Sequence, residues 1–128
     1  YHSRTFLFYA WREIPGFSTF GSYSATAGLP LITLDFKPQL AFFKRTDDTG
    51  EWFIADTGRD PYDDKETKRL YADTNASENS GTDRIQFGSN FIKVRGAHTS
   101  SDPNVGGTYV YSIFGEHPFA GATPAAAL

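Results

Sequence analysis

Few side chains in this sequence could perform acid–base or nucleophilic chemistry. The 128 residues include no cysteine, which excludes disulfides, thiolate metal sites and thiol nucleophiles. The three histidines are His2, His98 and His117, and His98 precedes Asp102 with two serines close by. Closeness along the chain does not make a Ser–His–Asp triad, which depends on geometry across a scaffold. No nucleophile elbow, P-loop or dinucleotide fingerprint is present, so the sequence predicts a protein that is not an enzyme.

A cluster of carboxylates is the best candidate for a metal site. Its members are Asp56, Asp60, Asp63 and Asp64. Oxygen-rich loops of this kind can hold Ca²⁺, but this spacing does not match the EF-hand pattern. Arg59 and Lys65 also neutralise part of the charge. We therefore expect a solvated acidic loop, with no metal and no cofactor.

Aromatic side chains could stack on the faces of sugars. Trp11 and Trp52 lie within apolar runs, so packing in the core is predicted for both. Tyr62 lies among acidic residues and Pro61, which favours an exposed position. Because specificity usually resides in loops, Arg59 and Tyr62 are the predicted contact residues, for a neighbouring protein or for a glycan.

Charge and hydropathy exclude several classes of partner. The net charge is −3, and acidic and basic residues are mixed along the chain, so no basic stripe suits a nucleic acid. No apolar run approaches the length of a membrane-spanning helix, and the first residues lack the order of a signal peptide. The 12 Phe, 7 Tyr and 2 Trp favour sheet over helix.

The residues discussed above must be positioned by short strands, because apolar runs alternate with turn signals and no helical period is sustained. About eight or nine strands with such spacing predict an all-β protein, an antiparallel β-sandwich of the jelly-roll or concanavalin-like kind. Strands are expected over residues 5–11, 17–25, 31–36, 39–45, 51–56, 68–72, 84–87, 91–95 and 108–114. Polar loops are expected over residues 57–67, 73–83 and 96–107.

The run over residues 5–11 is apolar on both faces, which predicts a central strand covered on both sides. Fully buried positions are expected to include Phe42 or Phe43, together with Phe53 and Val110, because these lie in the middle of apolar runs.

Residues 5–15 resemble residues 108–118 at one constant offset. Thr, Glu and Pro are identical in the two segments, and the aromatic and aliphatic positions between them largely correspond. Either the chain comes from a tandem array or two sheet strands have converged on one pattern. We expect a single domain over residues 1–119, in which 1–15 could be the end of a preceding repeat, and a flexible Ala-rich tail over 120–128.

Several motifs keep a common order and spacing over about residues 5–119. They are the runs at residues 15–23, 36–38, 43–47, 50–54, 56–62, 88–91, 95–96, 106–109 and 116–119. Together they resemble a β-rich domain of tail-fibre and structural proteins of marine tailed bacteriophages. The chain departs from that pattern at Ala25-Thr26-Ala27-Gly28, where the family commonly has a Gly-Asn-Gly turn.

The resemblance implies a location on the virion, after assembly in the bacterial cytoplasm. It implies a structural module exposed on the surface of a tail fibre or a capsid, in contact with other virion proteins. By analogy with phage fibres, a homotrimer is expected. The alternative is a module of a tail fibre that binds glycan on the host surface. A glycan-degrading enzyme would need a pair of carboxylates at a cleft, and no such pair is identifiable.

Overall fold

The computed structural model describes residues 5, 7–25, 29–59, 66–82, 84–96 and 102–117. These residues form nine strands and no helix. The strands are β1 (Ser18–Ala25), β2 (Leu31–Thr33), β3 (Pro38–Arg45), β4 (Phe53–Asp56), β5 (Glu66–Tyr71), β6 (Asn79–Thr82), β7 (Ile85–Phe87), β8 (Phe91–Val94) and β9 (Gly107–Gly115).

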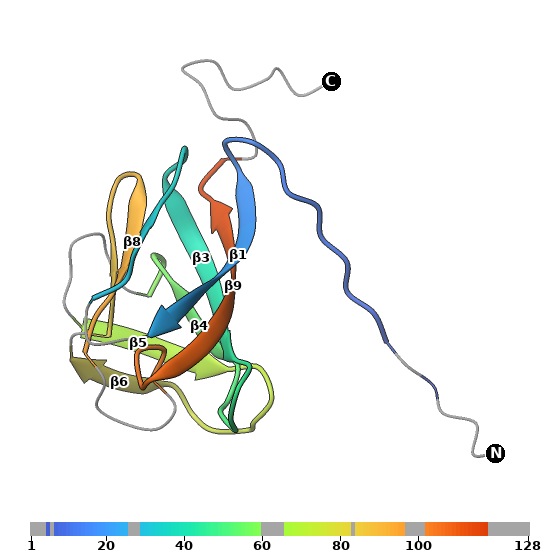
Figure 1. Cartoon of the computed structure of the whole chain (residues 1–128), viewed down its shortest axis with the longest axis vertical. Helices are drawn as coiled ribbons and strands as arrows, with labels where there is room; N and C mark the ends of the chain where they lie inside the picture. Colours follow the sequence, from blue (N-terminus) through green and yellow to red (C-terminus); the bar gives the residue numbers. More distant parts are fainter. Residues whose placement is uncertain are drawn as a thin grey trace.

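The strands form two antiparallel sheets that pack face to face (Figure 1). The larger sheet has six strands in the order β1-β9-β3-β4-β5-β6, and the smaller has the order β2-β8-β7. Sequence neighbours form the hairpins β3–β4, β4–β5, β5–β6 and β7–β8. The predicted all-β class and β-sandwich architecture are therefore confirmed.

The last strand, β9, lies inside the larger sheet between β1 and β3. It pairs with β1 from Ser18↔Phe114 to Ala25↔Gly107. It also pairs with β3 along most of its length. Gly107, at the start of β9, has a φ of 102°, and a Cβ there would lie 2.5 Å from the Asp47 carboxylate. The turn into β9 therefore requires glycine at this position.

The hydrophobic core lies between the inner faces of the two sheets. Phe43 and Phe53 from the larger sheet are fully buried, as predicted, and their rings contact each other edge to face at 6.2 Å. Ile92 and Val94 cover them from the smaller sheet. The prediction for Val110 is wrong, because its side chain is 38% exposed. Successive residues of a strand point to opposite faces, and the neighbouring Tyr109 is the one that points inward.

Residues 5–11 were predicted as a buried central strand, and this prediction is wrong for the described residues. Leu7, Phe8, Tyr9 and Trp11 are 59–85% exposed and belong to no strand. The segment leads away from the start of β1 and lies outside the sandwich (Figure 1). Its two-sided apolar pattern does suit a central strand, but in this chain the central position is occupied by β9. Burial of Trp11 is therefore wrong as well, and so is burial of Trp52, which is 41% exposed.

The structure also differs from the sequence prediction in the bounds of several strands and in two of the predicted loops. Strand β2 ends at Thr33, although Leu34 and Phe36 remain in the core. The predicted loop over 73–83 contains β6, because the backbone of these polar residues pairs with β5 in an antiparallel ladder. The predicted loop over 96–107 has a buried part, in which Asp102 is fully enclosed. The Ala-rich tail over 120–128 lies outside the described residues.

Two single changes should separate the core from the outer segment. Replacing Phe53 by Ala should lower the free energy of unfolding by about 3–5 kcal/mol, because the cavity cannot collapse between two sheets. Replacing Phe8 by Ala should change it by less than about 0.5 kcal/mol, because the side chain is already in solvent. Urea denaturation followed by circular dichroism measures both. Equal losses would show that residues 7–11 pack against the body of this domain.

Candidate binding surface

Part of the outer face of the larger sheet is apolar where a solvent-facing sheet would be polar. In register across five strands, Phe20 pairs with Ser112, Ser112 with Phe42, Phe42 with Ile54, and Ile54 with Leu70. These side chains alternate with the buried residues of the same strands, so they point away from the core. We call this set, together with Leu40, Trp52, Val110 and Phe114, the outer aromatic face.

Phe114 is the centre of this face. Its ring makes edge contacts with four other rings at centroid distances of 5.8–6.4 Å, namely Phe17, Phe20, Phe42 and Trp11. Trp11 also stacks on Tyr9 at 6.0 Å with an interplanar angle of 14°. Each aromatic pair contributes roughly 0.5–1.5 kcal/mol beyond the burial of its area. The outer aromatic face is therefore a preformed cluster of rings and not a set of isolated side chains.

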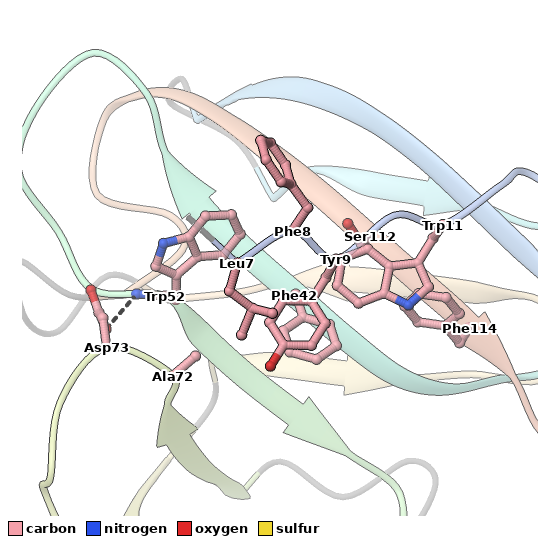
Figure 2. Close-up of a pocket in the computed structure, with 10 residues that line it drawn as sticks. All are labelled: Leu7, Phe8, Tyr9, Trp11, Phe42, Trp52, Ala72, Asp73, Ser112 and Phe114. Carbon is pink, nitrogen blue, oxygen red and sulfur yellow. Dashed lines mark hydrogen bonds between the residues drawn. The ribbon is translucent and has the colours of Figure 1, made fainter. Parts of the chain in front are cut away.

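A groove of about 630 Å³ separates the segment around residues 7–11 from the outer aromatic face (Figure 2). Phe8 projects to the opposite side of the segment from Leu7 (Figure 2). The ten lining residues are Leu7, Phe8, Tyr9, Trp11, Phe42, Trp52, Ala72, Asp73, Ser112 and Phe114. Eight of these ten are apolar or aromatic, so the groove suits an apolar or aromatic partner.

The polar groups of the groove lie at Asp73 and Ser112. Asp73 Oδ1 accepts a hydrogen bond of 3.1 Å from the backbone N–H of Trp52 (Figure 2). The backbone N–H of Ala72 donates to the Trp52 carbonyl at 3.1 Å. These bonds fix the backbone of Trp52 at the end of the groove, immediately before β4. A half-exposed indole is a common feature of binding surfaces.

The structure places Arg59, one of the two predicted contact residues, against its own domain. Its Nε donates to Asp56 Oδ2 at 2.6 Å, and its Nη1 lies 3.6 Å from Glu78 Oε2. The other contact candidate, Tyr62, lies outside the described residues, as do Asp60, Asp63 and Asp64 of the carboxylate cluster. A shared contact surface of Arg59 and Tyr62 therefore stays a prediction of the sequence.

A buried ionic cluster joins the loop before β9 to both sheets. Asp102 is fully buried, and its Oδ1 accepts hydrogen bonds from Arg69 Nη1 and Arg84 Nε. Arg69 also lies over the rings of Phe53 and Tyr71, at 5.9 and 5.4 Å from their centroids. Burial strengthens these contacts but makes an unpaired charge very costly. The cluster fixes the loop before β9 to β5 and to the start of the smaller sheet.

Two tyrosines of the larger sheet hold the same loop. Tyr23 donates to the carbonyl of Pro103, and Tyr109 donates to the carbonyls of Asp102 and Val105, each at 3.2 Å. Their rings stack at 5.3 Å. Burial raises the pKa of Tyr23 far above its ordinary value, and burial also raises the pKa of Tyr109. Both phenols therefore stay protonated and act as donors over the whole physiological range.

The described residues contain no group of three His, Cys, Asp or Glu side chains arranged to hold a metal ion. His98 and the two serines before Asp102 lie outside these residues. Within the same ranges, no helix has the length and hydropathy needed to cross a membrane.

The sequence analysis missed both the outer aromatic face and the Asp102 cluster. A signal for the outer aromatic face was present in the adjacent pair Phe42-Phe43, because neighbouring apolar residues in a strand point to opposite faces. No comparable signal marks Asp102, since its two arginines come from distant parts of the chain.

Fold and surface together define an antiparallel β-sandwich with one apolar outer face. Comparison of sequences adds the family: the chain belongs to the family described as a domain of unknown function, DUF7483, whose model matches residues 2–118. No curated protein and no solved structure matches the chain. The match includes both the exposed segment before β1 and the central strand β9.

Replacing Asp102 by Asn should strongly destabilise the fold. The change leaves two buried guanidinium groups without their shared carboxylate, which should lower the free energy of unfolding by about 3–5 kcal/mol. Asp47→Asn is the matched control, because it removes the carboxylate of an Arg45 ion pair at the surface and should have little effect. Chemical denaturation of both variants measures the difference. Similar losses in the two would contradict a structural role for the buried cluster.

Proposed function

We propose that this domain is a non-catalytic interaction module, and that its contact surface is the outer aromatic face. The observation on which this rests is the row from Phe20 to Leu70 across five strands, which is apolar at every position except Ser112. A contiguous apolar surface on a folded domain usually marks an interaction site. Aromatic side chains such as Trp52 are enriched at the centres of such sites.

The resemblance described above supports a virion as the setting. In this proposal the module lies on the surface of a tail fibre or a capsid of a tailed bacteriophage, and its partners are other virion proteins. Copies of the module associate, with a homotrimer as the leading arrangement by analogy with phage fibres. Association would also stabilise a small domain that has no disulfide, because partners that bind only the folded form shift the unfolding equilibrium.

A second candidate function, binding of host glycan, is favoured by the rings that line the groove. Tyr9 and Trp11 stack on each other and are largely exposed, and Trp52 stands at the other end. Exposed aromatic faces stack well on sugar rings, and Asp73 and Ser112 could accept or donate hydrogen bonds to hydroxyls. The groove has few such polar groups, so contact with protein is the better-supported function.

The paired change Trp52→Ser and Leu70→Ser tests the contact surface. Both side chains are on the outer aromatic face and are 41% and 37% exposed, so each change should cost at most about 1 kcal/mol of stability. The content of the module in purified phage particles should fall at least about tenfold, which corresponds to about 1.4 kcal/mol of binding free energy. Immunoblotting of the particles measures it.

Leu31→Ser is the matched control, because Leu31 is exposed on β2 of the smaller sheet. The control variant should assemble normally. If the paired variant also assembles normally but the phage no longer adsorbs to its host, the outer aromatic face binds the host and the second function holds. If assembly and adsorption both survive, this face is not the contact surface.

A further inference from the structure

The segment before β1 has the sequence pattern of a central strand, but its described residues belong to no sheet in this chain. Its residues 5–12 align with residues 108–115, which form nearly all of β9. In β9 the aligned residues pair with β1 on one edge and with β3 on the other, and the smaller sheet covers their inner face. Here the same pattern leaves Leu7, Phe8, Tyr9 and Trp11 mostly in solvent. Burial of large apolar side chains is a main source of folding free energy, and this segment leaves four of them without it.

We propose that residues 5–11 form the last strand of another copy of this domain, in the position that β9 occupies here. The segment would insert between β1 and β3 of that copy and complete its six-stranded sheet. Successive domains of an array would then share strands, each domain supplying the final strand of the one before it. The proposal concerns contact between copies of this domain and does not depend on a virion as the setting.

The inner face of the β9 position accepts the side chains of the segment. Tyr111 of β9 faces inward and lies against Gly21 of β1. A Cβ on Gly21 would be only 2.5 Å from the hydroxyl oxygen of Tyr111. The corresponding residue of the segment is Phe8, an aromatic that can use the same space. Ala10 corresponds to the fully buried Ile113 and is smaller. Phe8 and Ala10 are therefore compatible with the core. Arg12 corresponds to the buried Gly115, where a Cβ would lie 2.9 Å from the Phe36 ring, so the inserted strand ends at Trp11.

The outer side of the β9 position also accepts the segment. Trp11 corresponds to Phe114, the centre of the outer aromatic face, and Leu7 corresponds to Val110. Trp11 already contacts the ring of Phe114 in this chain, at 6.1 Å. A large aromatic residue at that position would meet the same phenylalanines of β1 and β3 that surround Phe114. The alternation of Leu7, Phe8, Ala10 and Trp11 thus suits both faces of the sheet at the β9 position.

A two-copy chain with a shared strand tests this proposal. Residues 13–107 are joined directly to residues 5–128, so that the first copy has neither β9 nor residues 5–12 of its own, and residues 5–12 of the second copy are the segment that follows it in place of β9. The first copy should fold, and the amides of Leu7 to Trp11 should exchange with solvent at least about a hundredfold more slowly than in the single chain, as expected for a central strand. Hydrogen exchange with mass spectrometry measures this, and limited proteolysis should give two protected units.

Phe8→Asp supplies the control. In the single chain Phe8 is 85% exposed, so the change should leave its melting temperature unaltered. In the shared-strand chain the carboxylate would enter the core of the first copy, and protection of that copy alone should be lost. A second shared-strand chain carries Ala10→Ile, which restores the side chain of Ile113 in case the smaller residue alone prevents folding. If the first copy stays unprotected even with Ala10→Ile, or if Phe8→Asp leaves its protection unchanged, the proposal is wrong.

Discussion

The fold depends on the insertion of β9 between β1 and β3. This strand comes from the C-terminal part of the described chain, and yet its hydrogen bonds join the first strand of the sheet to the β3–β4–β5–β6 meander. Without it, β1 would have no partner in the larger sheet. Pairing between such distant segments is entropically costly to nucleate, because the intervening chain must be closed into a loop. Formation of the sandwich should therefore be limited by docking of its last strand.

The buried ionic cluster and the two tyrosines serve the same strand. Asp102 binds Arg69 and Arg84, while Tyr23 and Tyr109 hold the loop between Asp102 and the start of β9. A buried carboxylate with two arginines adds less net stability than apolar packing of the same volume would, because desolvating three charges is costly. Its effect is specificity: the loop has one position in which these charges are paired. That position determines where β9 begins.

The outer aromatic face follows from the central position of the same strands. Strands β3 and β9 have neighbours on both edges and apolar residues on both faces, a pattern normally found where both faces are covered. In this chain the inner face is covered by the smaller sheet, while the described residues nearest the outer face are those of the exposed segment from Leu7 to Trp11. A bound partner would cover the outer face, and insertion into another copy of the domain would bury the segment.

Much of the architecture was predictable from the sequence, because strand alternation and turn residues are local properties. The all-β class, the two strands on either side of Gly88 and the burial of Phe43 and Phe53 all followed from such patterns. Arg59 was a reasonable contact candidate by residue type, but only the structure shows its ion pairs with Asp56 and Glu78. The position of Tyr62 remains a prediction of the sequence alone.

The sequence by itself determined the all-β class and the position of most strands, and it showed that residues 5–12 share the pattern of β9. The tertiary structure decided which of the two segments occupies the sheet, and it left Trp11 exposed where the pattern predicted burial. It also brought Arg69 and Arg84 to Asp102 from separate parts of the chain. Local patterns specify how a segment can pair, but a sheet has one central position, and competition for it is settled only by long-range contacts.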